Sequence, residues 1–432
     1  MKRIFSVLII LAFVCMLPGC DSGKNIASGS AKSSSAVSSV PSSSALSSVD
    51  KDHFLGLTNR QMLEDYDYMW KTLDENYPYY GVAQRSGVDV QGVKSKYRAQ
   101  MEKCSSDWQY CSIIEKALDS LRGTKYVSMG HLGLLDPVGF KVFQNICFDN
   151  MKSIFADQST IKNYKKYLAV TNALYPKKVS AEINSLNTSQ NVTAKVIDND
   201  TAYVKINSFM KADQEIQSEG EALIRFYKQN SNKKNLIVDI SENTGGSENY
   251  WMNNIVAPNI TKKFSVNTYC LIKKGSNNMQ YLAYAYNYDL NPISKLPNLP
   301  KINHDDLKNL DAFATNDISV NPQTPGKKMF QGKIWVLVSN KTYSAAEAFS
   351  SFCKRTGFAT IVGTRTGGDG VLKNSFLFFT LPNSRLVVQY GCEYGLNADG
   401  SCNQEYGTAP DVVPKAGQTP YDACMEAIRL KK

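Results

Sequence analysis

The chain has 432 residues, 43% of them hydrophobic and 20% charged, which is the composition of a globular protein with a sizeable core. Its formal net charge is +10, yet Lys and Arg are scattered along the chain and form no single stripe. This pattern argues against nucleic acid as a partner and is typical of a solvated surface.

The N-terminal segment MKRIFSVLIILAFVCMLPGC predicts a secretory signal peptide over residues 1–19. Two basic residues precede an apolar run that is too short for a comfortable membrane span. The ending Leu-Pro-Gly-Cys resembles a bacterial lipobox, which implies acylation of Cys20. We therefore expect a lipid anchor at the cell membrane, on the extracytoplasmic side (periplasmic or cell-surface). An ordinary signal peptide that happens to contain a cysteine is the alternative.

Residues 20–50 are almost pure Ser, Ala, Gly and Val, and they predict a flexible linker behind the lipidated cysteine. Residues 51–135 carry apolar positions at helical spacing, as in MLEDYDYMWKTLDENYP and CSIIEKALDSL. This spacing predicts a small N-terminal helical domain. Residues 136–200 are poorly periodic and form a connecting region without an assigned fold.

Residues 201–432 predict an α/β domain. Strands are expected at TAYVKINSF, KNLIVDI, SVNTYCLIKKG, KIWVLVSN and ATIVGTRTGG, and they alternate with helical stretches such as EGEALIRFYKQ. Because the strand cores are nearly all apolar, we expect cover on both faces of the sheet. SFLFFTLPNSRLVVQYG predicts a hairpin that turns at residues 382–384, and YDACMEAIRL predicts a C-terminal helix.

The cysteine pattern predicts no metal site, because no C-x-x-C pair or His/Cys cluster is present. An exported chain permits disulfides. The most plausible pair is Cys392 with Cys402, which brackets the turn-like GLNADGS. Free thiols are an equally open alternative.

Ser344, in KTYSAAEAF, stands between a predicted strand and a run of helix formers. It is either a helix N-cap whose side chain accepts a backbone N–H, or a nucleophile presented where a strand turns into a helix. A serine nucleophile needs a base, usually a histidine held by a carboxylate, and N–H donors for the oxyanion.

Candidates for these roles lie far apart in the sequence. Of the three histidines, His131 in GHLGLL is the one that a loop could hold at a cleft wall, although it could also be structural. Gly245 and Gly246 follow an apolar strand and either offer amides to an oxyanion or form a plain turn. Glu405 in NQEYGTAPDVVP could orient an imidazole or be solvated, and Glu393 in GCEYG is its nearest rival.

Taken in order, GHLGLL, LIVDISENTGG, TYSAAEAF, GTRTGGDG and EYGTAPDVVP resemble motifs of the bacterial C-terminal-processing (tail-specific) serine peptidases, in particular the branch similar to the tricorn core protease. The resemblance covers roughly residue 57 to the C-terminus. It implies a crotonase-like, tail-specific-protease fold with a β-β-α superhelical core behind the helical domain. The roles that it implies are nucleophile for Ser344, general base and acid for His131, orienting carboxylate for Glu405, and oxyanion donors for the N–H groups of Ala345 and of Gly245 or Gly246.

One branch of this family uses a Ser–Lys dyad, with the lysine in G-x-x-T-x-G-K-G. The matching segment GTRTGGDG places Asp369 in that position, and a carboxylate cannot act as the general base that lysine provides there. We therefore expect the Ser–His–Glu arrangement. Two departures from the family pattern are Met129 where an acid is common before Gly-His, and Ser241 where arginine is common. No clear PDZ-like segment lies between residues 131 and 201.

We expect a membrane-anchored serine peptidase that cleaves proteins or peptides outside the cytoplasm through an acyl-enzyme, without a metal or cofactor. One alternative is a catalytically inactive peptide-binding or scaffold lipoprotein of the same fold, which the Met129 departure motivates. Another alternative is a hydrolase of a non-peptide ester or acyl group.

Overall fold

The computed structural model describes residues 50–126, 128–146, 151–177, 179, 190–285, 289–374 and 376–430. The predicted signal peptide, Cys20 and nearly all of the linker lie outside the described residues. Within the described ranges, no helix is both long and apolar enough to cross a membrane.

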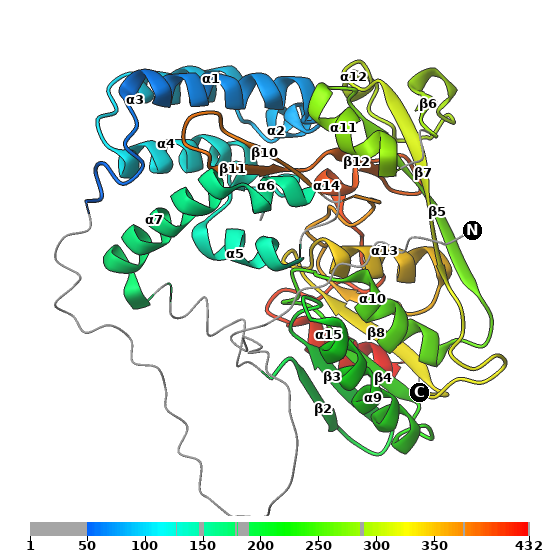
Figure 1. Cartoon of the computed structure of the whole chain (residues 1–432). Coiled ribbons are helices and arrows are strands. Elements are labelled where there is room, and N and C mark those ends of the chain that lie inside the picture. The colour runs from blue at the N-terminus through cyan, green and yellow to red at the C-terminus, as the bar shows by residue number, and fades with distance from the viewer. Residues whose placement is uncertain are drawn as a thin grey trace, which may run out of the picture.

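The first part of the chain is helical, as predicted (Figure 1). Side chains of Thr58, Asp89 and Ser106 accept backbone N–H groups and so cap the starts of three of these helices. The region without an assigned fold is also largely helical, so the helical part extends well beyond residue 135. The helices are α1 (Asn59–Asn76), α2 (Tyr80–Arg85), α3 (Val90–Met101), α4 (Asp107–Asp119), α5 (Pro137–Ile146), α6 (Lys152–Ala156) and α7 (Gln158–Leu174).

A five-stranded sheet with the order β2-β3-β4-β8-β9 forms the centre of the second part. Four of its strands are parallel, and β2 is antiparallel at one edge. The strands are β2 (Val192–Val196), β3 (Thr201–Ile206), β4 (Asn235–Asp239), β8 (Lys333–Val338) and β9 (Thr360–Gly363).

Helices cover both faces of this sheet, as its apolar strands predicted. Side chains of α9 (Asp213–Gln229), α10 (Glu248–Trp251) and α13 (Ala345–Thr356) share a core with one face. Side chains of α15 (Pro420–Leu430) pack with the other face. The α/β class with a helical N-terminal region is confirmed.

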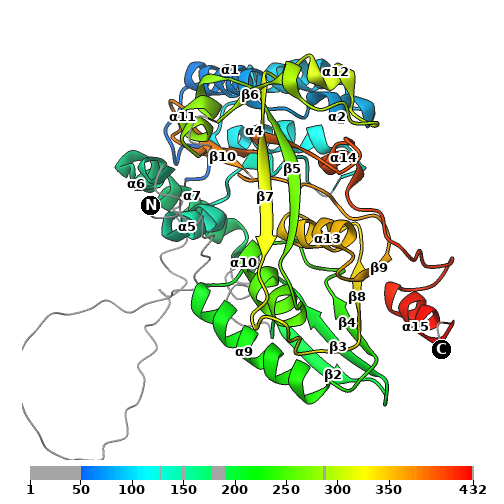
Figure 2. The same ribbon diagram turned by 90° about the vertical axis from the view of Figure 1, so that its right-hand side faces the viewer.

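Two smaller sheets join the helical part to the five-stranded sheet. The long pair β5 (Phe264–Ile272) and β7 (Ala312–Val320) runs between them (Figure 2). The predicted hairpin is confirmed as β10 (Leu377–Thr380) and β11 (Val387–Tyr390). The remaining elements are β1 (Gly133–Leu134), β6 (Asn291–Pro292), β12 (Glu393–Leu396), α11 (Ser276–Ala285), α12 (His304–Leu307) and α14 (Asn403–Tyr406).

The largest core combines buried side chains of the helical part with those of β10, β11 and β12. Leu73 of α1 and Phe378 of β10 belong to this one cluster although they come from opposite ends of the chain. The helical part therefore packs on strands that the chain supplies much later.

The predicted disulfide between Cys392 and Cys402 is wrong. Cys392 and Cys402 are both buried free thiols. The register explains the error, because Cys402 pairs across the turn with Leu396 and not with Cys392. The Cys392 thiol instead donates to the backbone oxygen of Asn374 at 3.3 Å.

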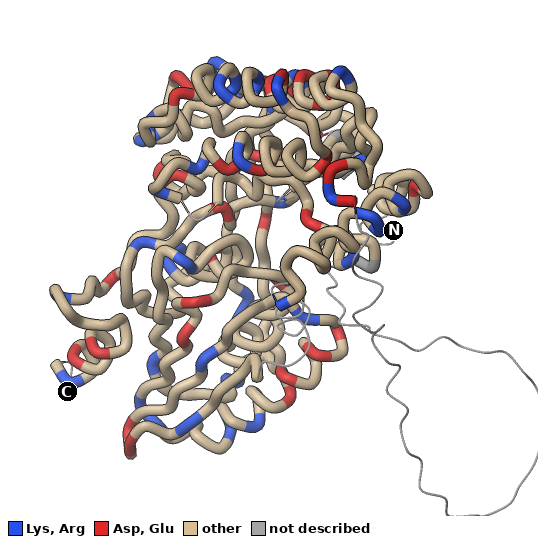
Figure 3. Tube along the Cα trace, turned by 90° about the vertical axis from the view of Figure 1, so that its left-hand side faces the viewer, with Lys and Arg blue, Asp and Glu red and all other residues tan. Residues whose placement is uncertain are grey.

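Charged residues of both signs are interspersed along the traced elements (Figure 3). Among the described residues, no single stripe of one sign stands out in this view. This distribution is the one expected of a solvated surface.

Candidate active site

Ser344 lies at the turn from β8 into α13 in a conformation that is rare for a residue with a side chain. Its φ is 53° and its ψ is −125°, and its side chain caps no backbone N–H. The N-cap alternative is therefore wrong, because it required the Ser344 side chain to accept a backbone N–H. The backbone N–H of Ser344 donates to the oxygen of Gly368 at 3.1 Å, and that of Gly367 donates to Thr342 at 2.8 Å. These bonds hold a turn that costs on the order of 1–3 kcal/mol in backbone strain.

The two predicted glycines, Gly245 and Gly246, are packed so closely that neither position has room for a Cβ atom. A Cβ on Gly245, whose φ is 108°, would come within 2.8 Å of Ser344 Cβ and 2.9 Å of the Ala345 nitrogen. A Cβ on Gly246 would collide with the backbone of Met210. The glycine pair thus permits a backbone approach that no other residue type allows.

Only some of the predicted oxyanion donors are free. The N–H of Gly245 donates to Asn243 Oδ1 at 2.9 Å, so it is already occupied. Among the described residues, the N–H groups of Gly246 and Ala345 make no hydrogen bond to the protein. These two amides are therefore the pair that could receive an oxyanion.

His131 is presented by a loop of residues 128–132, here called the histidine loop. Its φ is 52° and its side chain is 15% exposed. The ring centroid lies 5.1 Å from that of Tyr343, the residue before Ser344. The Nδ1 atom lies 2.7 Å from Oδ2 of Asp369, whose side chain is fully buried. A carboxylate only accepts, so Nδ1 carries the hydrogen, and in the neutral imidazole Nε2 is the nitrogen with a lone pair.

The carboxylate beside the imidazole is Asp369, and the prediction of Glu405 for this position is corrected. Glu405 pairs at 2.7 Å with the guanidinium of Arg85, which also holds Asp306 at 2.7 Å. Its neighbour Gln404 contacts the histidine loop instead, since Gln404 Oε1 accepts the N–H of Gly130 at 3.0 Å. The segment was thus correctly associated with the site, but its charged group faces away from the histidine.

The rival carboxylate, Glu393, also has another role. It is fully buried and accepts the backbone N–H groups of Lys373 at 2.9 Å and Asn374 at 3.1 Å. It therefore fixes the loop that follows Asp369 in the sequence.

The sequence carries one signal for Asp369, namely its place where the dyad branch of the family has lysine. That position must lie beside the nucleophile, and here Gly368 pairs with Tyr343 across an isolated parallel bridge. Asp369 itself cannot act as that base. As a carboxylate in the same place, it can hold a histidine that arrives from elsewhere in the chain.

Asp369 is surrounded by hydrogen-bond donors. Besides His131, the hydroxyl of Tyr343 donates to it at 2.8 Å and that of Tyr79 at 3.0 Å. Burial, followed by the Asp369 charge, raises the pKa of both tyrosines well above the ordinary value of 10.0. Both hydroxyls therefore remain protonated and can donate to an ionised carboxylate.

A second buried acid, Glu347, lies one turn after the serine in α13. Its Oε1 accepts from Asn403 at 2.6 Å and from Thr408 at 2.7 Å. Burial raises the pKa of Glu347 to about 7. Asn403 in turn accepts the N–H of Gly370 at 2.9 Å, so this cluster ties the serine helix to the loop that carries Asp369.

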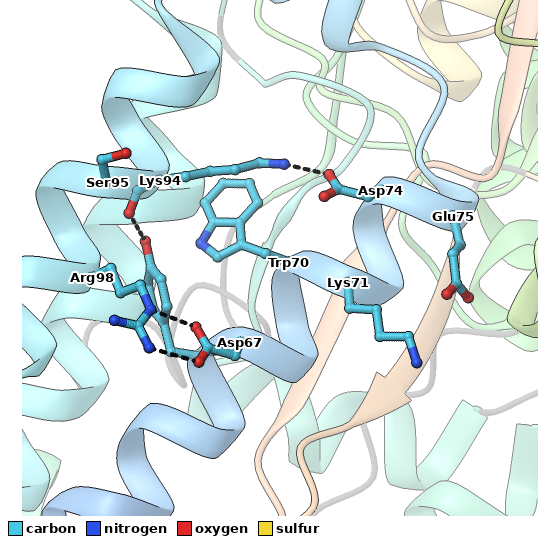
Figure 4. A pocket seen from close by; sticks show the side chains of 9 residues that line it. Asp67, Trp70, Lys71, Asp74, Glu75, Lys94, Ser95 and Arg98 are labelled. Atoms are coloured by element: carbon cyan, nitrogen blue, oxygen red, sulfur yellow. Dashed lines mark hydrogen bonds and ion pairs between the residues drawn. The ribbon is translucent and has the colours of Figure 1, made fainter.

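A surface pocket of about 440 Å³ between α1 and α3 is separate from this site (Figure 4). Four of its charged side chains pair with one another, since Arg98 binds Asp67 through two bonds of 2.9 and 3.0 Å and Lys94 pairs with Asp74. Neither Ser344 nor His131 lines it. Among the described residues, no group of His, Cys, Asp and Glu could hold a metal ion.

Comparison with known proteins was made on both sequence and structure. Residues 200–413 match the profile of peptidase family S41, a range that contains Ser344 and Asp369 but not His131. No curated protein has a sequence that matches the chain.

The fold is similar to solved structures at low sequence identity. A candidate peptidase from Parabacteroides merdae has a TM-score of 0.52 and 18% identity, over 87% of this chain and 97% of the other. Mature CPAF complexed with lactacystin has a TM-score of 0.50 and 12% identity, over 86% and 97%. A photosystem II D1 C-terminal processing protease has a TM-score of 0.42 and 14% identity, over 83% and 94%. At these identities the likeness concerns the fold.

Proposed function

The chain belongs to peptidase family S41, and from that premise we propose that it is a serine peptidase acting on proteins or peptides through an acyl-enzyme on Ser344. The observation that carries the proposal is the bond between His131 Nδ1 and the buried Asp369, beside the strained serine turn. This arrangement resembles the support of a general base in other serine hydrolases.

In the proposed reaction, Ser344 Oγ attacks the carbonyl carbon of a peptide bond while His131 Nε2 takes the hydroxyl proton. The carbonyl oxygen becomes an oxyanion, which the N–H groups of Gly246 and Ala345 receive. Asp369 remains ionised and stabilises the imidazolium that forms.

The intermediate then collapses. The carbon–nitrogen bond breaks, His131 gives its proton to the departing amine, and Ser344 is left as an ester of the acyl fragment. Water, deprotonated by His131, attacks this ester, and the serine regains its proton as the acid product leaves.

We place this activity outside the cytoplasm, at a membrane surface. The support is the sequence alone: a signal peptide that ends in a lipobox-like Cys20, followed by a linker of about thirty residues. Such a linker has an r.m.s. reach on the order of 30 Å, so the folded part could move well clear of the lipid.

A fluorophosphonate probe tests the proposal without knowledge of the substrate. We expect the purified wild-type protein to be labelled once, at Ser344, and Ser344→Ala and His131→Ala to remove the labelling. A matched control is Ser350→Ala, since Ser350 lies in the same helix with its hydroxyl bonded to the backbone oxygen of Ala346 at 2.8 Å. This variant should be labelled like wild type.

Well-folded wild-type protein that takes no label would contradict the proposal and favour a catalytically inactive peptide-binding or scaffold lipoprotein. If labelling occurs, cleavage of a peptide library separates a peptidase from an esterase. Labelled protein that cleaves simple esters but no peptide would contradict the peptidase assignment.

A further inference from the structure

Two tyrosines between α1 and α2 lie directly against the histidine loop. The hydroxyl of Tyr77 donates to the backbone oxygen of Met129 at 2.8 Å. The ring of Tyr79 packs on Gly130, where a Cβ would come within 2.5 Å of Tyr79 Cε2. Both tyrosines are buried, with at most 1% of their surface exposed. They belong to the helical part, which lies outside the residues that match the family profile.

The Tyr79 hydroxyl has one hydrogen and lies between two acceptors, of which the carboxylate of Asp369 is the stronger. It is 3.0 Å from Asp369 Oδ1 and 2.5 Å from the backbone oxygen of Glu393 in β12. The other carboxylate oxygen, Oδ2, faces Tyr343 and His131. Tyr79 is thus the polar side chain that contacts the carboxylate oxygen turned away from the imidazole.

The ring of Tyr79 is itself fixed. It stacks on Tyr394 at a centroid distance of 5.6 Å and an interplanar angle of 25°, and it meets the edge of Tyr77 at 5.6 Å. A hydroxyl on a ring held in this way cannot follow Asp369 if the carboxylate rotates. It therefore defines one orientation of the carboxylate.

We propose that Tyr79 is a positioning residue for the reaction, holding Asp369 in the orientation that aims His131, so that the N-terminal helical part completes the catalytic centre. This inference rests on the proposed function. The physical reason is that three hydrogen-bond donors, on His131, Tyr343 and Tyr79, share the negative charge of Asp369. Removal of one donor leaves more of that charge to stabilise the imidazolium that forms on His131.

Tyr77 and the Cys392 thiol, both near Asp369, stay neutral over the pH range of the test, whereas Glu347, whose pKa burial raises to about 7, titrates within it. Burial raises the pKa of Tyr77 and of the Cys392 thiol well above their ordinary values, and the Asp369 charge acts in the same direction on both. Because Glu347 is present in the wild type and in every variant compared, a difference between their acid limbs reports on the pair of His131 and Asp369.

The test measures the rate of fluorophosphonate labelling against pH for the full-length protein in detergent. Tyr79→Phe keeps the ring and removes only the hydroxyl. We expect labelling at the plateau to slow about tenfold, the size of effect typical of one hydrogen bond to a charged group. The midpoint of the acid limb should move to higher pH, whereas Asp369→Asn should move it to lower pH.

A double-mutant cycle separates positioning from general support. In an Asp369→Ala background, Tyr79→Phe should change the rate by less than about twofold, because the carboxylate that accepts the Tyr79 hydrogen bond is already absent. The matched control is Tyr110→Phe in the same helical part, where a fully buried hydroxyl donates to the buried Asp65 at 2.9 Å. This control should lower the melting temperature and leave the rate and midpoint unchanged.

An equal loss of rate in both backgrounds, or an unmoved midpoint in Tyr79→Phe, would overturn the inference. If Tyr79→Phe does not fold, 3-fluorotyrosine at position 79 provides the second measurement. Its more acidic hydroxyl is a stronger donor, so the midpoint should move to lower pH, and a shift to higher pH would count against the inference. Absence of labelling in the wild type would instead contradict the proposed function itself.

Discussion

The imidazole of His131 meets its carboxylate 238 positions away in the sequence, and several other acids lie within the same region of the fold. Their surroundings give them different roles. Asp369 faces the imidazole, Glu405 faces the guanidinium of Arg85, and Glu393 accepts backbone N–H groups. At the scale of single residues, the direction in which a carboxylate points decides its chemistry.

Exchange of the two carboxylates for amides tests this distinction. Asp369→Asn should lower kcat by on the order of 10³ to 10⁴, because an amide favours the wrong imidazole tautomer and cannot stabilise the imidazolium. Glu405→Gln should change kcat little and mainly lower the melting temperature, since Arg85 keeps Asp306 as a partner. Steady-state kinetics on a cleaved peptide and thermal melting measure both. A loss in Glu405→Gln as large as that in Asp369→Asn would return the orienting role to Glu405.

At the scale of elements, the serine depends on three segments that converge on one turn. The turn from β8 into α13 presents it, the glycines after β4 lie against it, and the segment after β9 bonds to its backbone. Parallel strands bring their carboxyl ends to the same edge of a sheet, which is why these loops meet. The position of the site follows from the order of the strands.

Gly245→Ala tests how closely the glycine must approach the serine. The new Cβ would displace the turn, and a misplacement of about 1 Å can cost on the order of 10²-fold in rate. We therefore expect at least about a hundredfold slower fluorophosphonate labelling. Gly326→Ala is the matched control, since Gly326 also has a positive φ, 74°, but open space around its Cβ position. Gly326→Ala should lower the stability of the protein without slowing its labelling. Equal labelling rates in the two variants would show that the close approach of Gly245 to Ser344 is unimportant.

At the scale of the whole molecule, the helical part and the α/β part form one packed structure. The largest core contains side chains from both, and Arg85 of α2 pairs with acids of α12 and α14. The histidine comes from a loop on the helical side and the serine from the sheet side. Complete assembly of the chain is therefore needed to bring the candidate site together.

The expected membrane attachment also concerns the whole molecule. Cys20→Ser should abolish incorporation of a labelled fatty acid and move the protein from the membrane fraction to a soluble extracytoplasmic fraction. Cell fractionation and fatty-acid labelling measure this. Cys15→Ser, within the same predicted signal peptide, should behave like wild type. Unchanged membrane association of Cys20→Ser would contradict the lipid anchor.

The sequence by itself determined the elements and the family. Apolar strands, the hairpin, the C-terminal helix and the motifs around Ser344 and Gly245 are local patterns, set by side-chain periodicity and turn chemistry within a few residues. The first helices could be predicted for the same reason. Their extension beyond residue 135 could not, because α5 and α6 are short and the apolar positions of α7 form only a weak stripe.

Only the tertiary structure decided which groups meet. Three findings depend on strand register and loop direction across long chain separations. Asp369 and not Glu405 lies beside His131, the N–H of Gly245 is already hydrogen-bonded, and Cys392 and Cys402 form no disulfide. A local pattern contains no information on the distance between segments that are hundreds of residues apart. Burial and hydrogen bonding in the folded chain fix that distance, and with it the partner of the histidine.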